Sequence, residues 1–106
     1  MPNGVERDWV RLCGAVHGFY SRYRKWPTHL RVYEGNLQKL FTPESWAIVN
    51  EKIAFVYDGS THIADDLQGN SYNYGQEGFA EGFDLDFVQD WFGVQPDSDY
   101  FLESPW

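Results

Sequence analysis

Every basic residue of this chain lies in its first half, and the last of them is Lys52. Positions 1–52 hold all eight Lys and Arg residues and five of the sixteen acids, a net charge of +3. Positions 53–106 hold the other eleven acids and no Lys or Arg, a net charge of −11. The excess negative charge of the second half must be compensated by contact with the first half, by a basic partner or by a bound cation. The charge distribution therefore constrains both the fold and the surface.

The length and composition indicate one domain. A chain of 106 residues with 42% hydrophobic content can bury a core without disulfides or metal. We expect this domain to span 1–106, with 94–106 able to form an extended C-terminal tail. The single cysteine, Cys13, cannot form an internal disulfide, which favours a reducing compartment. Because neither a signal peptide nor an apolar run of about 20 residues is evident, the sequence predicts a cytoplasmic protein.

The N-terminal segment has the pattern of an amphipathic helix that ends before Pro27. Its apolar residues recur at spacings of three and four and fall within one stripe of the helix surface. The stripe consists of Val5, Trp9, Leu12, Cys13, Val16, Tyr20 and Tyr23.

The next segment has the pattern of a β-α-β unit. An alternating strand over 28–33 is followed by a short helix over 37–41 and a second helix that Thr42 caps and Pro43 begins. Residues 53–57 are apolar on both faces, which is typical of a strand inside a sheet.

The C-terminal half begins with a turn. Asp58-Gly59 predicts a hairpin whose return strand is 61–64, because both residues tolerate positive φ. A further strand over 71–74, a glycine-punctuated loop over 75–83 and a helix between the cap Asp84 and the stop Gly93 follow. We therefore predict an α+β fold: a single small domain with its N-terminal helix on a mixed sheet of about four strands, a hairpin meander after the β-α-β unit, a C-terminal helix and an irregular acidic aromatic tail.

Two glycines lie on the back of the N-terminal helix. Gly14 and Gly18 are four residues apart, flanked by Arg11 and Arg22. Each glycine inside a helix costs about 1 kcal/mol relative to alanine, so a close approach by another element should accompany them. That element is another part of the same chain, such as the acidic last helix, or a dimer mate, or an anionic ligand. The four residues are thus candidate interface residues.

Histidine, aspartate and tyrosine side chains supply the candidates for a small-molecule site. His29 and His62 could meet on adjacent strands with Asp65 or Asp66 as a partner for general-base chemistry. An aromatic pocket could be lined by Tyr57, Tyr72 and Tyr74. These tyrosines, with the two histidines and two aspartates, are the candidate site residues if the protein binds a small ligand or is a small enzyme. A structural or surface role is the alternative for each histidine.

Neither a metal nor a cofactor is expected. The carboxylates near 65–66 and 84–90 do not follow the calcium-loop pattern, and Asp84 is explained by helix capping. Cys13 lies in the apolar stripe, where a buried and inert thiol is expected.

Charge and aromatic content lead to the functional hypothesis. Twenty aromatic residues can anchor a contact that the acids steer, notably Tyr100, Phe101 and Trp106 in the tail. We expect a non-catalytic interaction protein that presents an acidic aromatic surface to a basic protein partner, as an inhibitor, antitoxin or nucleic-acid mimic would; a homodimer is a further form of this hypothesis. The net charge of −8 disfavours nucleic acid as the partner.

Overall fold

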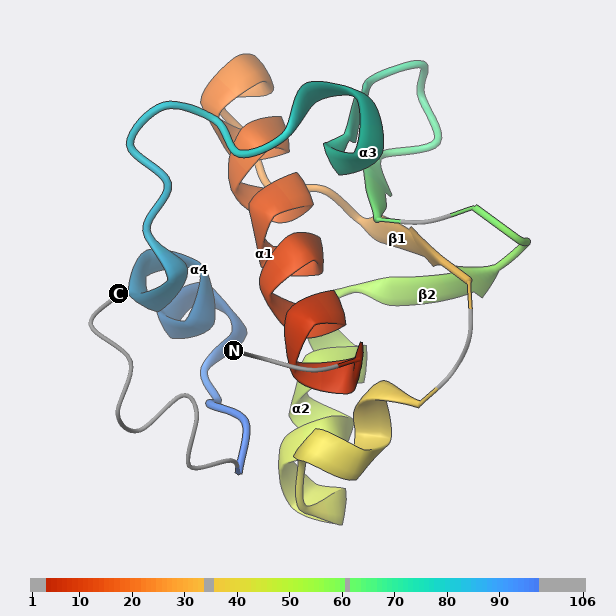
Figure 1. Ribbon diagram of the computed structural model, residues 1–106, viewed down its shortest axis with the longest axis vertical. Coiled ribbons are helices and arrows are strands. Elements are labelled where there is room, and N and C mark those ends of the chain that lie inside the picture. Colours follow the sequence, from red (N-terminus) through yellow and green to blue (C-terminus); the bar gives the residue numbers. More distant parts are fainter. Residues whose placement is uncertain (1–3, 34–35, 61, 98–106) are drawn as a thin grey trace.

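The computed structural model describes residues 4–33, 36–60 and 62–97. The elements follow the order α1 (Gly4–Tyr23), β1 (His29–Val32), the 3₁₀ helix η1 (Leu37–Leu40), α2 (Pro43–Lys52), β2 (Ala54–Tyr57), β3 (Ile63–Asp65), β4 (Ser71–Asn73), α3 (Tyr74–Glu77) and α4 (Leu85–Phe92). Helix α1 stands at the centre, with α4 on one side and the strands on the other (Figure 1). The predicted α+β domain with its N-terminal helix against a mixed sheet of four strands is confirmed.

The sheet has the strand order β2-β1-β3-β4. Strand β1 pairs in parallel with β2 and antiparallel with β3, and β4 pairs antiparallel with β3. Across β1, β3 and β4, the residues Leu30, Ala64 and Tyr72 share one register row and are buried, while their strand neighbours are mostly half-buried or exposed. Because side chains alternate between the faces of a strand, the helices cover one face of the sheet.

Two expectations about the sheet are wrong. The strand after α2 lies at an edge and not inside the sheet, so Tyr57 is exposed. The turn at Gly59 has the expected positive φ of 83°, but β2 and β3 do not pair, because β1 lies between them. Strand β3 therefore lies on the other side of β1 from β2.

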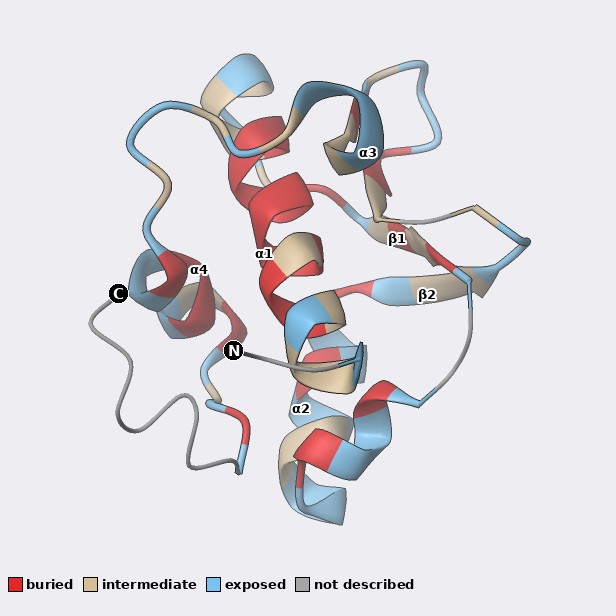
Figure 2. Ribbon diagram, viewed as in Figure 1, coloured by how far each residue is buried: buried red, intermediate tan, exposed pale blue. Residues whose placement is uncertain are grey.

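Helix α1 is buried around its whole circumference in its central turns (Figure 2). Every residue from Leu12 to Phe19 is buried, because α1 packs against β3, β4, α3, η1 and α4 at once. A helix enclosed in this way needs small residues where the neighbouring elements come closest. The helix ends where Arg24 adopts a left-handed φ of 58°.

The core between α1, α4 and η1 is built around Trp9. Its ring centroid lies 5.0 Å from that of Phe41 and 5.1 Å from that of Phe92. Its buried indole Nε1 donates to Oε1 of Gln89 on α4 at 2.9 Å. A buried indole N–H needs such a partner, so this bond fixes α4 against the first half of α1.

The helix caps predicted at Thr42 and Asp84 are present, whereas the side chain of Asn36, predicted to cap the short helix, makes no capping hydrogen bond. Thr42 accepts from the backbone N–H of Ser45 at the start of α2, and Asp84 accepts from those of Asp86 and Phe87 at the start of α4. Gly93 ends α4 with a φ of 83°. Tyr74, predicted to end a strand, and residues 75–77, predicted as loop, form the single helical turn α3. None of the helices in the described part of the chain is both long and apolar enough to cross a membrane.

Candidate functional site

Ion pairs join the basic half of the chain to the acidic half. They connect the end of α1, the residues after it and β1 to acids of the sheet and α3: Arg22 to Glu77, Lys25 to Asp66 at 2.8 Å, and Arg31 to Asp58 at 2.5 Å and Asp65 at 2.6 Å. The predicted contact between the two halves therefore exists, and it neutralises the acids on one side of the molecule.

In two of these pairs the hydrogen bond from the cation is the main cause of a lowered pKa of the acid. The ammonium of Lys25, with hydrogen bonds from Asn70 and two backbone amides, holds the pKa of Asp66 well below its usual range. The guanidinium of Arg22 likewise lowers the pKa of Glu77. Both acids are ionised at neutral pH, and both are engaged with cations of the same chain.

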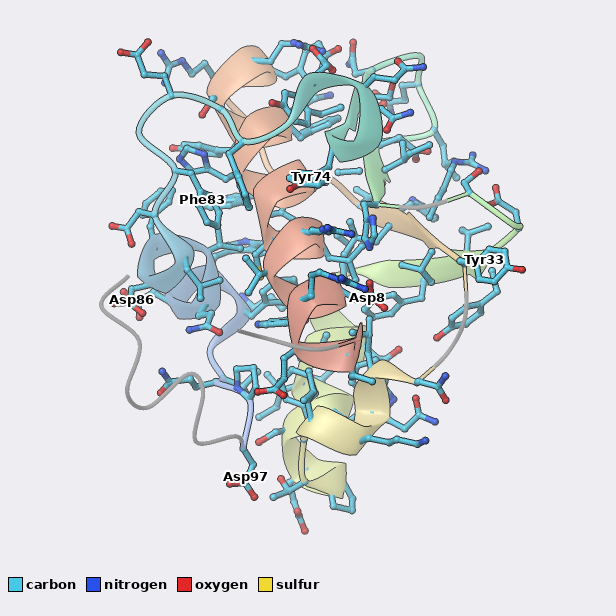
Figure 3. All side chains as sticks on the ribbon, in the orientation of Figure 1. Asp8, Tyr33, Tyr74, Phe83, Asp86 and Asp97 are labelled. Carbon is cyan, nitrogen blue, oxygen red and sulfur yellow. The ribbon has the colours of Figure 1, made fainter. Side chains whose placement is uncertain are left out.

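The remaining described acids of the second half make no ion pair with a Lys or Arg of the described residues. They are Glu81, Asp84, Asp86, Asp90 and Asp97. Three of these belong to α4 or its cap, and Asp86 projects from the outer side of that helix (Figure 3). The unneutralised negative charge therefore gathers on and around α4.

The exposed side of α4 carries two parallel rows of side chains. The buried residues of the helix are Leu85, Val88, Gln89 and Phe92. At about 100° per residue, Asp86 and Asp90 form one row on the opposite side, and Phe87 and Trp91 form the row beside it, since positions four apart lie on one face. The ring of Phe87 is 41% exposed, although an aromatic of this size is usually buried.

The aromatic row continues onto the C-terminal end of α1. The rings of Trp26 and Trp91 stack with centroids 4.6 Å apart, and Tyr20 stacks on Trp26 at 4.3 Å. Phe87 lies 5.5 Å from Trp26 and 5.7 Å from Tyr20. We call this set the α4 surface: Tyr20, Trp26, Phe87 and Trp91 with Asp84, Asp86 and Asp90.

An open groove lies beside the carboxylate row. It has a volume of about 340 Å³ and is lined by Asp86, Gln89, Asp90 and the residues 93–95 that follow the helix. The groove can admit a side chain of another molecule, and both its acids could contact a cation placed there.

His17 lies beneath the α4 surface. Its ring packs edge-on against Phe83 at 5.6 Å and Phe87 at 6.2 Å, and its buried Nδ1 has no hydrogen-bond partner among the described residues. Burial lowers the pKa of His17, and the nearby Asp84 opposes this only in part. The ring is therefore neutral at pH 7 and acts as an apolar support.

The glycine face of α1 is covered by the chain itself. A β-carbon at position 14 would lie 2.8 Å from the ring of Phe79, and one at position 18 would collide with the ring of Tyr72. No second chain can approach these glycines, which corrects the expectation of an interface there. The covering residues belong to β4, to α3 and to the loop after α3, and not to the last helix.

The two arginines predicted with the glycines also make contacts within the chain. Arg22 pairs with Glu77 and lies 4.9 Å from the centre of the Tyr72 ring. Arg11 lies 5.9 Å from the centre of the Tyr74 ring. Arg22 is therefore engaged on the glycine face, whereas Arg11 keeps its guanidinium free of ion pairs with the described residues.

The predicted histidine and aspartate site does not assemble. His29 pairs with Asp65 across β1 and β3, but Asp65 is bound by Arg31 and the imidazole of His29 contacts Thr28. His62 lies with Asp8, a residue the sequence reasoning missed, at 3.3 Å between Nε2 and Oδ1. Because Asp8 and His62 are far apart in the sequence, no local pattern indicated this pair.

The three tyrosines predicted to line one pocket are also separated. Tyr57 lies on the edge strand β2, while Tyr72 is on β4 at the other edge. Tyr72 is buried and donates its hydroxyl to the carbonyl of Gly78 at 2.7 Å. Tyr74 packs on Phe79 at 4.9 Å. Tyr72 and Tyr74 thus cover α1, at the opposite end of the sheet from Tyr57.

The predicted tail residues Tyr100, Phe101 and Trp106 lie outside the described residues. The part of the tail before them packs on the domain, because Pro96 is buried and the amide of Asp97 donates to the carbonyl of Leu40 at 2.6 Å.

Metal and thiol chemistry receive no support from the geometry. No group of three or more potential ligands converges in the described ranges. Cys13 is fully buried, and burial raises the pKa of its thiol well above the usual value.

Comparison with known proteins finds no matching family model, no matching curated protein and no matching solved structure. The α4 surface was not predicted from the sequence, which indicated only the helix between Asp84 and Gly93. A signal was present, because an Asp-aromatic dipeptide occurs at 86–87 and again four residues later at 90–91.

Proposed function

We propose that the protein is a non-catalytic interaction protein whose α4 surface binds a basic, arginine-containing segment of a partner protein. The observation that carries this proposal is the pair of adjacent rows on α4. One row holds carboxylates without an ion pair to the described residues, and the other holds the exposed Phe87 and the half-buried Trp91. The proposed location is the cytoplasm.

Electrostatics supports a basic partner. The ion pairs with Arg22, Lys25 and Arg31 neutralise acids elsewhere, whereas Asp84, Asp86 and Asp90 make no ion pair with the described residues and leave a negative field on α4. Such a field speeds the encounter with a cationic partner and weakens as salt screens it.

The neighbouring rings favour arginine over lysine. A planar guanidinium can stack on an aromatic face while it donates to a carboxylate. The ammonium group of lysine is not planar, so it cannot combine these two contacts in the same way. Asp86 and Asp90 lie beside Phe87 and Trp91, so one arginine side chain could use both rows. Aromatic side chains at the centre of an interface supply much of its binding energy.

A titration with a synthetic peptide of alternating Arg and Leu tests the proposal. We expect binding by the wild-type protein that weakens steeply with salt, and weaker binding of the same peptide with Lys in place of Arg. The double variant Asp86→Asn/Asp90→Asn should lose about 0.5 to 1 kcal/mol of binding free energy per carboxylate. Phe87→Ala should also weaken binding.

The matched control removes the same charge from α2. Glu44 and Glu51 are exposed there, so Glu44→Gln/Glu51→Gln should bind the peptide almost as the wild type does. If the two double variants weaken binding equally, peptide binding depends on the net charge of the protein alone, and the α4 surface is not the binding site.

A further inference from the structure

A cavity of about 440 Å³ lies on the other side of α1 from the α4 surface. It opens between the first turns of α1, the end of β1, the start of η1 and the residue before β3. Asp8 and Tyr33, two of its lining residues, lie on this side of α1 in Figure 3. Its volume is within the range of small-molecule sites, at the lower end.

The cavity has an apolar floor. Four aliphatic side chains line it: Val5, Leu12, Val32 and Leu37. Three of them are almost completely buried, so the floor belongs to the core and is preformed. An apolar ligand group placed there would gain free energy by leaving water.

His62 belongs to the polar rim of the cavity and is held in place by its neighbours. Its backbone has a left-handed φ of 59°, its carbonyl accepts from the amide of Tyr74 at 3.0 Å, and its ring meets the Tyr74 ring edge-on at 6.0 Å. A histidine in this conformation carries strain, which is often found at binding sites. Because a carboxylate only accepts hydrogen bonds, Nε2 carries the proton that points at Asp8.

Arg11 provides the cation of the rim. The ion pairs of the described residues do not include it, and its guanidinium lies near the Tyr74 ring. Burial lowers the pKa of His62, with Arg11 and Arg7 acting in the same direction against Asp8. His62 is therefore neutral at pH 7, and Arg11 is the positive group that faces a ligand.

We propose that this cavity binds a small organic carboxylate with an apolar body, whose carboxylate pairs with Arg11 while the body lies on the aliphatic floor. A planar guanidinium matches a carboxylate through two parallel hydrogen bonds. A dianionic phosphate fits less well, because Asp8 on the same rim repels its second charge and Arg11 is the one cation among the described lining residues.

Calorimetric titration with 3-phenylpropionate tests this inference, with its neutral amide as the matched ligand. We expect the carboxylate to bind and the amide to bind at least about tenfold more weakly, because a charge-assisted pair is lost. Arg11→Gln should reduce affinity for the carboxylate by a similar factor, and Arg11→Lys should retain part of it. Val5→Phe, which fills the floor, should weaken both ligands.

Arg7→Gln is the matched control, because Arg7 is an exposed neighbour on the same helix that does not line the cavity. It should bind within about twofold of the wild type. Thermal melting of each variant verifies that it is folded. Equal binding of acid and amide, equal losses for Arg7→Gln and Arg11→Gln, or no binding to the wild type would each overturn the inference. Asp86→Asn/Asp90→Asn should leave carboxylate binding unchanged, so this inference and the proposed function fail separately.

Discussion

The ring of Tyr72 occupies the space that a β-carbon at position 18 would fill. Glycine at this position is what lets β4 approach α1 so closely. The ring cannot move aside easily, because its hydroxyl is bonded to the carbonyl of Gly78 and Arg22 lies over its face. The close packing of α1 against β4 thus needs glycine at position 18.

Overpacking usually costs about 1–3 kcal/mol, and alanine returns up to about 1 kcal/mol in a helix. Because the β-carbon would collide with the Tyr72 ring, we expect Gly18→Ala to destabilise the protein by a net of about 1–2 kcal/mol. Urea denaturation measures the change. Gly4→Ala is the control, because a β-carbon at position 4 meets nothing within 4 Å. A Gly18→Ala protein as stable as the wild type would show that β4 does not lie on α1.

The turn after β2 provides a second test. Gly59 has a φ of 83°, and a β-carbon at this position would meet no other atom within 4 Å, so a substitution there acts through backbone strain alone. Gly59→Val should cost about 1 kcal/mol or more, and Gly59→Asn less, because asparagine tolerates a left-handed backbone. Equal melting temperatures for all three proteins would contradict the assigned conformation.

The pair between Lys25 and Asp66 predicts a specific pH dependence. The folded protein holds the pKa of Asp66 below the ordinary value of 3.8. The stabilisation is therefore complete above that value and is lost as the pH falls below it towards the lowered pKa. The melting temperature of wild type should exceed that of Asp66→Asn at pH 7, and the difference should shrink between about pH 4 and pH 2.

Asp90→Asn serves as the control for this pH series, because Asp90 makes no ion pair with the described residues. Its melting temperature should stay close to that of wild type throughout. A difference for Asp66→Asn that is constant across the whole series would mean that the ion pair does not form.

Cys13 should be unreactive in the native protein. Because the thiol is fully buried and burial raises its pKa, little thiolate is available and the reagent has no access. Ellman's reagent should label it at the rate at which the protein opens, and urea should accelerate labelling in step with unfolding. Rapid and complete labelling of the folded protein would show that α1 is not packed as described.

Local signals in the sequence predicted the elements of this fold well. Apolar spacing identified α1, and the caps Thr42 and Asp84 marked the helices that follow, since capping depends on a few adjacent residues. The turn at Gly59 was also recognised, but not the pairing of the strands on either side of it, because turn chemistry does not reveal whether a third strand lies between them.

Contacts between distant positions were harder to predict. The glycines indicated a close approach on the back of α1, yet nothing local identified Tyr72 and Phe79 as the covering rings. In the same way, the charge distribution made contact between the halves one of three alternatives, without specifying which acids Arg22, Lys25 and Arg31 would bind. The acids left over define the candidate site, so that site emerged only once the pairs were known.

The most direct test of the proposed function is to map the amides of the ¹⁵N-labelled protein by NMR during titration with the Arg-Leu peptide. The largest shifts are predicted at residues 84–94 and at the indole N–H groups of Trp26 and Trp91, with small changes on the outer face of the sheet around Arg31. Shifts centred on Arg31 and β1, or spread evenly over all exposed acids, would contradict the proposal that the α4 surface is the binding site.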